Sequence, residues 1–311
     1  MCIRDSTLNE YSASGKKEKD VKIEINNPIY DVEGRYLAIG ENNGQRLYLI
    51  SEDHVIWEKS VDGNLDKVTV NKNGYVSAIV TGTTYKSVII TYDEKGNELF
   101  KTYLSKTIAV DACVSPDNAE FAYAEVNNSG TTIQSNIKII SIKDVKEKNT
   151  EPKYEYNAVQ GSLILRIKYQ DKSRLICMYD DSIHKFETGV DVELTKLNED
   201  NPKITFADIE LSNYVFRTYE KSTSLFRADT IIEMQNTSNG KENVYTIEEV
   251  AKSVVSNNNV IAVNLGNEVY FVETNAWLIK RYSSSQVIEK IILGDGVAGI
   301  IYSDKIEIVN L

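Results

Sequence analysis

The sequence predicts an all-β protein, a β-propeller built from four-stranded antiparallel blades. Short runs rich in Val, Ile, Tyr and Thr alternate with turns of Gly, Asn and Asp, a pattern typical of β-hairpins. No window of helical length keeps apolar residues three and four positions apart between capping residues; residues 247–256 come nearest, and their β-branched side chains make a strand at least as good an interpretation as a helix. The same order of strands and turns recurs seven times along the chain.

Each repeat has an inner strand, a tight turn, a second strand, a looser loop, a third strand, a hairpin and an outer strand. The seventh stops after three strands. Starts of successive repeats lie roughly 37–55 residues apart, which brackets the ~40–50 residues of a propeller blade. A β-sandwich would not repeat one strand order seven times, and a β-helix has much shorter repeats. The repeats span 28–63, 65–104, 108–159, 163–197, 204–248, 250–283 and 287–311.

The N-terminal residues predict that the chain begins within a blade. Residues 20–25 (DVKIEI) stand where the outer strand of a preceding blade is expected, and propellers commonly use an N-terminal strand to complete the last blade. Residues 1–6 (MCIRDS) are not a signal peptide, and they equal the translation of a transposon end used in sequencing adapters. We expect 1–6 to be an adapter artefact and 7–311 to be one N-terminally truncated propeller domain. A genuine short terminus is the alternative.

Charge limits the class of partner. The chain has 35 Lys and Arg against 46 Asp and Glu, a formal net charge of −11. Nucleic-acid binding needs clustered cations to neutralise phosphates, and an anionic lipid surface needs them too. No run of 18 apolar residues is present to span a membrane. We therefore expect no nucleic-acid partner and no direct membrane insertion by these residues.

Residues able to bind metals or act as nucleophiles are sparse. Cys113 and Cys177 each lie in an apolar strand, where an isolated thiol is more often a small core residue than half of a disulfide or a metal site. His54 and His184 have no metal-ligand spacing. One alternating polar motif resembles a calcium loop but lacks its final Glu, so an ordinary turn between blades is the simpler interpretation. Its residues are Asp62, Asn64 and Asp66.

Catalytic motifs are also missing. The sequence has no G-x-S-x-G, no H-E-x-x-H and no Walker loop. An enzyme would need charged groups to converge where the inner strands meet, but those strands are mostly aliphatic. The charged candidates there are Asp111, Arg166, Lys168 and Asp208. We expect no catalytic site, no cofactor and no metal.

Several stretches resemble a known propeller repeat. LYLISEDHVIWEKSVDG is similar to the quinoprotein-like repeat, in which a third strand, a turn and a Trp end at a Gly; Trp57 and Gly63 hold those places. Phe100 replaces the Trp in the second repeat, and Trp277 is expected at the same place in the sixth. Residues 114–126 (VSPDNAEFAYAEV) resemble the S-P-D-G turn of many propeller repeats, with Asn in place of Gly.

Over residues 20–311 the chain resembles an uncharacterised family of Gram-positive bacterial proteins. Its members have a short N-terminal membrane anchor followed by an extracytoplasmic quinoprotein-like propeller. The resemblance implies a membrane-anchored, extracytoplasmic protein with eight blades when intact, the anchor and most of one blade preceding this chain. The matching motifs describe blades rather than chemistry, so the resemblance implies no activity.

We therefore expect a non-enzymatic scaffold that binds a protein partner. The 19 Tyr residues leave a carbohydrate- or ligand-binding propeller as an alternative, and a quinone-dependent or glycan-active enzyme as a weaker one. The loops between second and third strands vary in length while the hairpins stay tight, and loops vary where function is tuned. The expected interaction face is formed by those loops and includes Asn42, Asn43, Thr84, Tyr85, Asn127, Asn128 and Lys221.

Overall fold

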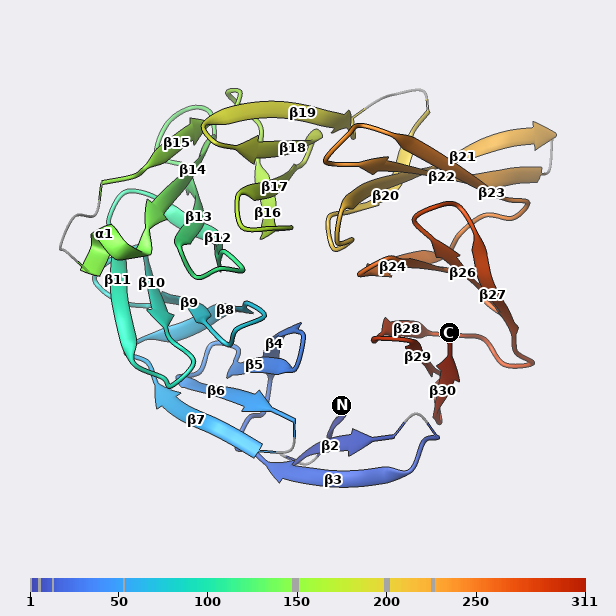
Figure 1. The fold of residues 1–311 in the computed structure, drawn as a ribbon, viewed down its shortest axis with the longest axis horizontal. Helices are drawn as coiled ribbons and strands as arrows, with labels where there is room; N and C mark the ends of the chain where they lie inside the picture. The colour runs from blue at the N-terminus through green and yellow to red at the C-terminus, as the bar shows by residue number, and fades with distance from the viewer. Residues whose placement is uncertain are drawn as a thin grey trace. The chain divides into compact units, whose positions relative to one another are not determined.

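The computed structural model describes residues 2–4, 7–12, 14–52, 54–146, 151–198, 202–224 and 227–311. It confirms the seven-bladed, all-β propeller fold, with six blades of four antiparallel strands and a seventh of three (Figure 1). In the part of the chain that it describes, the single helix is α1 (Ile142–Lys146), one short turn between two strands of blade 3.

Blades 1 to 4 follow one another with strands in sequence order. Blade 1 is β4 (Pro28–Glu33), β5 (Tyr36–Glu41), β6 (Arg46–Ser51) and β7 (His54–Ser60). Blade 2 is β8 (Asn64–Val70), β9 (Val76–Thr81), β10 (Ser87–Tyr92) and β11 (Glu98–Leu104). Blade 3 is β12 (Ile108–Val114), β13 (Glu120–Asn127), β14 (Gln134–Ser141) and β15 (Tyr154–Asn157). Blade 4 is β16 (Ile164–Tyr169), β17 (Arg174–Tyr179), β18 (Ser182–Glu187) and β19 (Val190–Lys196).

The remaining blades keep the same order. Blade 5 is β20 (Ile204–Asp208), β21 (Tyr214–Ser224), β22 (Arg227–Asn236) and β23 (Glu242–Ile247). Blade 6 is β24 (Ser253–Asn257), β25 (Val260–Asn264), β26 (Glu268–Glu273) and β27 (Leu278–Ser283). Blade 7 is β28 (Lys290–Leu293), β29 (Val297–Ile301) and β30 (Ile306–Asn310), the three strands that the sequence predicts.

The chain divides into two compact units, each described here by itself. The first unit comprises Met1–Glu10, Lys17–Asp180 and Phe186–Val192. The second unit comprises Tyr11–Lys16, Asp181–Lys185 and Glu193–Leu311.

Burial explains the strand sequences. The middle strands of blades 1 to 3 are packed on both faces, so β9 and β10 are buried along almost their whole length and read as continuous apolar runs. Outer strands such as β7 and β11 mix exposed and half-buried residues, with one buried residue each, because one face is partly open to solvent. The apolar core therefore lies between blades.

Aromatic pairs join successive blades of the first unit. The Trp57 ring of blade 1 lies 5.5 Å from the Tyr92 ring of blade 2, measured between centroids. Phe100 of blade 2 meets Phe121 of blade 3 edge to face at 5.1 Å. Such pairs add about 0.5–1.5 kcal/mol beyond the burial of apolar area. Trp57 and Phe100 thus hold equivalent places, as the resemblance to quinoprotein-like repeats predicts.

Trp277 does not share that place, contrary to prediction. In blade 1, Trp57 pairs with Leu49, and the equivalent strand position in blade 6 is Lys280, which pairs with Phe271. The longer turn before β27 leaves Trp277 outside the strand, and its side chain is 73% exposed. The Trp of the sixth repeat is therefore a surface residue rather than a core one.

An additional three-stranded sheet precedes blade 1. It is formed by β1 (Cys2–Arg4), β2 (Thr7–Tyr11) and β3 (Lys17–Lys22). The strand expected at 20–25 thus begins three residues earlier and ends at Lys22. Ile23 and Ile25 follow it and are buried in a cluster with apolar residues of β5 and β6. The adapter origin of residues 1–6 stays a prediction, and Met1, Asp5 and Ser6 lie outside the described residues.

Candidate interaction site

Six loops of the first unit lie at the same end of its blades. In an antiparallel blade, the connection between the second and third strands and the connection to the next blade emerge at the same end. We call these loops the loop band. Its segments are 42–45, 61–63, 82–86, 105–107, 128–133 and 158–163.

Hydrogen bonds link the loops of the loop band across blades. The amide of Asn43 donates to the carbonyl of Leu65 at 2.8 Å, which joins blade 1 to the first strand of blade 2. Lys86 Nζ donates to Asn128 Oδ1 at 3.2 Å and joins blade 2 to blade 3. Gln160 Nε2 donates to Thr132 Oγ1 at 2.6 Å within the next pair of loops. The loop band is therefore held in a defined arrangement rather than being a set of independent loops.

Two exposed tyrosines lie side by side at blade 2. The ring centroids of Tyr85 and Tyr103 are 4.8 Å apart, and the ring planes are tilted by 44°. Tyr85 is 39% exposed and Tyr103 54% exposed, so the pair presents apolar ring surface to solvent. Thr83 fixes the backbone of Tyr85, because its Oγ1 accepts a hydrogen bond from the Tyr85 amide at 3.1 Å. Such a turn limits the ordering that a bound partner must impose on the loop.

The structure places six of the seven predicted site residues in or beside the loop band. Asn43, Thr84, Tyr85 and Asn128 are exposed loop residues, and Asn42 is half-buried beside Asn43. Asn127, the last residue of β13, is half-buried, and its Oδ1 accepts a hydrogen bond from the Ser129 amide at 3.0 Å.

Lys221 belongs to the second unit and is described separately. It lies on β21, where it pairs with Asp229 of β22, and its side chain is exposed. The hairpin of β21 and β22 extends past the ends of the neighbouring strands, since pairing with β20 stops at Tyr219 and pairing with β23 stops at Thr230 (Figure 1). Its membership of an interaction surface stays a prediction.

Sequence reasoning missed Tyr103, Lys86 and Ser129. Tyr103 is on an outer strand, and it reaches Tyr85 only because β10 and β11 pair Val88 with Tyr103. The alternation of residues along β11 does indicate that the Tyr103 side chain is exposed.

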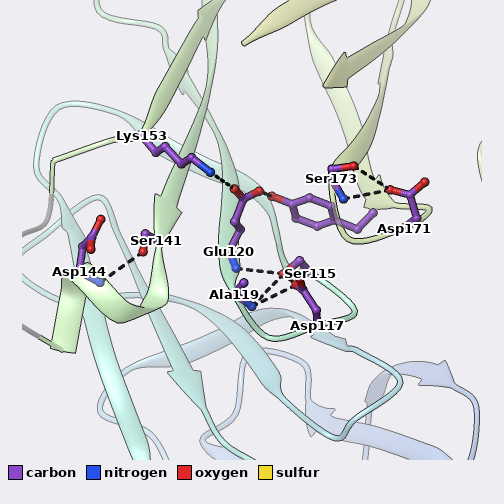
Figure 2. Close-up of polar contacts among 10 residues, drawn as sticks. Ser115, Asp117, Ala119, Glu120, Ser141, Asp144, Lys153, Asp171 and Ser173 are labelled. Atoms are coloured by element: carbon purple, nitrogen blue, oxygen red, sulfur yellow. Dashed lines mark hydrogen bonds and ion pairs between the residues drawn. The ribbon is translucent and has the colours of Figure 1, made fainter. Parts of the chain in front are cut away.

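The opposite end of the blades uses its polar groups within turns and between blades; Asn71 Nδ2 of blade 2, for example, donates to the carbonyl of Ser115 of blade 3 at 2.9 Å. Ser115 Oγ accepts hydrogen bonds from the amides of Ala119 and Glu120 and donates to Asp117 Oδ1 at 2.7 Å (Figure 2). The Glu120 carboxylate accepts from Lys153 Nζ at 2.7 Å and from the hydroxyl of a neighbouring Tyr at 3.3 Å. These groups stabilise turns and connect neighbouring blades.

Carboxylates on the inner strands connect neighbouring blades. Asp111 is almost fully buried; its Oδ1 lies 2.9 Å from Lys67 Nζ and its Oδ2 accepts from the Ile167 amide at 2.9 Å. In the same unit, Asp31 Oδ2 accepts from the Val70 amide at 2.8 Å. In the second unit, the Asp208 carboxylate on an inner strand accepts a hydrogen bond from the Ser256 hydroxyl at 2.8 Å.

The inner-strand cations are also in contact with other groups. Lys168 Nζ lies 3.2 Å from Glu33 Oε2, which joins blade 4 to blade 1 within the first unit. Arg166 pairs with Met178 in the β16–β17 ladder, and its side chain is half-buried. The charged residues that could serve a catalytic site therefore contact other strands or opposite charges. None of these contacts places a nucleophile beside a base.

The cysteines and histidines have structural surroundings. Cys177 is fully buried, and Cys113 is half-buried beside the same core cluster. Burial raises the pKa of both thiols well above its usual value. His184 contacts Ser182 Oγ at 3.1 Å, and His54 begins β7 on the surface. Among the described residues, no group of three or more His, Cys, Asp and Glu side chains is placed to hold a metal ion.

A sequence model of one protein family matches almost the whole chain. It covers residues 3–311 and is described as the family of unknown function DUF5711. The chain belongs to this family. A search of curated proteins finds no match to the sequence.

Solved structures show that this DUF5711 chain shares its fold with other propellers. Apo AztD from Citrobacter koseri matches with a TM-score of 0.64 at 10% identity, covering 98% of this chain and 89% of that one. BamB from Moraxella catarrhalis matches with a TM-score of 0.53 at 12% identity, covering 98% and 88%. Hsv2 from Kluyvelomyces marxianus matches with a TM-score of 0.54 at 13% identity, covering 89% of each chain. At these identities the likeness concerns fold alone.

The described residues contain no helix with the length and apolar character needed to cross a membrane.

Proposed function

We propose that this DUF5711 protein is a non-enzymatic scaffold that binds a protein partner outside the cell. The family resemblance supports an extracytoplasmic, membrane-anchored location. The charged side chains of the inner strands connect blades to one another. They are therefore not arranged around a substrate position, as catalysis requires. Binding is therefore assigned to the surface and not to the inner strands.

One observation favours the loop band as the binding surface. The Tyr85–Tyr103 pair is exposed, and its loop is fixed by Thr83 and flanked by the Lys86–Asn128 link. Tyrosine is enriched at protein interfaces because it offers a large, fairly rigid apolar surface with a polar end. Exposed aromatic anchors that are already ordered lose little conformational entropy on binding. These features support a protein-binding surface at blade 2.

Site-specific photo-crosslinking in native cells tests this proposal with the full-length protein. A photoreactive amino acid replaces Thr84 or Asn128 in the loop band, and Lys72 in the opposite turn of blade 2 serves as the control. The proposal expects one discrete protein adduct from the two loop-band positions and none from Lys72. The Tyr85→Ser, Tyr103→Ser double variant should lose that adduct. Equal adducts from all three positions, or none from Thr84 and Asn128, would refute it.

A further inference from the structure

The outer edge of β30 is the edge that accepts an outer strand in the other six blades. Their third strands, β6, β10, β14, β18, β22 and β26, each pair on this side with an outer strand of four to seven residues. In the part of the chain that the structure describes, β30 pairs with β29 alone. Ile306 of β30 is 52% exposed, whereas β6 and β10 are buried along almost their whole length. The edge of β30 therefore offers an apolar strand surface to a further strand.

The register of blade 7 shows which backbone groups lie on this edge. The Tyr302 amide donates to the Lys305 carbonyl, and the Leu311 amide donates to the Gly296 carbonyl, both at 2.9 Å. Bonded and non-bonded pairs alternate along an antiparallel ladder, so the odd-numbered residues of β30 bond to β29 and the even-numbered residues direct their amides and carbonyls outwards. The outward residues are Ile306, Ile308 and Asn310.

The two faces of β30 have different surroundings. Glu307 accepts a hydrogen bond from the Tyr282 hydroxyl of blade 6, and Val309 lies in the apolar cluster shared by blades 6 and 7. Ile306 and Ile308 alternate with these residues and therefore face away from blade 6. In an added antiparallel strand, the residues opposite Ile306 and Ile308 share that outer face. β-Branched side chains at those positions would form favourable cross-strand pairs with the two Ile side chains.

A cation lies at one end of the edge. Lys280 of β27 is exposed, and its Nζ donates to the Asn310 carbonyl at 2.7 Å. No carboxylate of the described residues pairs with Lys280, whereas Lys305, at the other end of the edge, pairs with Glu307. An acidic side chain opposite Val309 in an added strand would lie on the blade 6 face near the Lys280 ammonium. Charge complementarity therefore favours an acidic residue at that position.

We propose that the edge of β30 binds an extended segment of a protein partner as a fourth, antiparallel strand of blade 7. The segment carries Val or Ile opposite Ile306 and Ile308 and an acidic residue beside Lys280. Main-chain hydrogen bonds provide the affinity in such strand addition, and alternate side chains provide the specificity. The edge of β30 belongs to the second unit, so this binding surface is additional to the loop band and does not depend on it.

A second copy of the chain fits the edge less well. In a symmetric antiparallel pairing about Ile308, Lys305 of one copy lies opposite Leu311 of the other, at the end of the edge where Lys280 lies. Two cations then come together without a carboxylate between them. Each copy also carries a formal charge of −11, which opposes association of the two acidic chains.

Calorimetric titration of the full chain with a defined probe tests the inference. The probe is the capped peptide Glu-Val-Glu-Val-Thr-Val-Thr, whose antiparallel pairing brings Glu beside Lys280 and Thr opposite Glu307. One control is the reversed sequence, which places Glu opposite Glu307. The other is the probe N-methylated at each Val, because the Val amides face β30. We expect the probe to bind, the reversed peptide to bind about 3-fold more weakly, and the methylated peptide at least about 10-fold more weakly.

Two substitutions in the chain test the same contacts. Ile308→Pro removes an outward amide but leaves the hydrogen bonds to β29, and proline is tolerated at such edge positions. It should weaken binding of the probe at least about 10-fold, whereas the matched control Ile308→Val keeps the amide and should bind as the parent does. Lys280→Gln should weaken binding about 2- to 5-fold through loss of the ion pair.

Four results of the titrations would overturn the inference: no binding of the probe, equal binding of the methylated peptide, equal binding of the reversed peptide, or no loss in Ile308→Pro. A parent dimer in sedimentation that Ile308→Pro abolishes would also overturn it, since a second copy would then occupy the edge. The methylated peptide keeps the test decisive if Ile308→Pro does not fold. Failure here leaves the loop-band adduct at Thr84, and with it the proposed function, unaffected.

Discussion

Lys67 Nζ lies 2.9 Å from Oδ1 of Asp111, whose side chain is only 2% exposed. The same carboxylate accepts amide hydrogen bonds from Ala112 and Ile167, so it connects the inner strands of blades 2, 3 and 4. A buried charge is tolerated when it is paired and fully hydrogen-bonded. Asp111, the most buried inner-strand carboxylate of the first unit, thus has a structural role: it holds three blades together.

Replacement of Asp111 by Ala should be strongly destabilising. It would leave the Ile167 amide without an acceptor inside the core and remove the partner of Lys67, whose side chain is 33% exposed. We expect a loss of about 1–3 kcal/mol in the free energy of unfolding, measured by urea titration. Lys95→Ala, which removes a solvent-exposed ion pair with Glu94, should change that free energy by less than about 1 kcal/mol. Similar values for the two variants would contradict the structural role.

Gly96 allows blade 2 to approach Trp57. Its φ is +80°, and a Cβ atom placed there would lie 2.9 Å from Trp57 Cγ. Gly34 has a φ of +59° but no heavy atom within 4 Å of such a Cβ. Gly34→Ala should therefore cost only the backbone strain, about 1–2 kcal/mol. Gly96→Ala should cost about 1–3 kcal/mol more because it also overpacks the indole. Thermal unfolding of the two variants measures the difference, and equal losses would show that Trp57 is not packed on Gly96.

The two tryptophans should differ in accessibility to a quencher. Trp57 is 7% exposed and Trp277 is 73% exposed. In Trp57→Phe the remaining fluorescence should be strongly quenched by acrylamide, whereas in Trp277→Phe it should be protected until the protein unfolds. Quenching of both variants to the same extent would mean that the sixth repeat places its Trp as the first does.

The sequence predicts the blades well because each depends on local signals. Alternating strands, tight turns such as Asn71–Gly74 and the missing outer strand of blade 7 are all visible in short windows. Trp277 was misplaced because its position depends on the length of one turn, which shifts the residue out of the strand. The Tyr85–Tyr103 pair joins residues 18 positions apart and depends on the register of β10 and β11, which composition does not reveal. The pairing of Asp111 with Lys67 has no sequence signature beyond the alternation of their strands.

Acid should weaken the turn between β10 and β11. Burial acts to raise the pKa of Asp93, but hydrogen bonds from Asn97 and Lys95 outweigh it and lower that pKa below its usual value. The Asp93 carboxylate accepts from the Lys95 amide at 2.9 Å and from the Asn97 amide at 2.8 Å. A lowered folded-state pKa means that the stabilisation is fully present above the unfolded value, about 4, and is lost as the pH falls through the folded value.

Asp93→Asn keeps an acceptor oxygen but removes the charge. Hydrogen bonds to charged groups are stronger than neutral ones, so the variant should lose about 1 kcal/mol in the free energy of unfolding near pH 7. The difference from the parent protein should shrink towards zero near pH 3 or below, since the parent carboxyl is then increasingly protonated. Glu94→Gln, at a partly exposed neighbour in the same turn, controls for the change in net charge. Urea titrations of the three proteins at both pH values test this; a constant difference between Asp93→Asn and the parent would exclude the Asp93 carboxylate as the source.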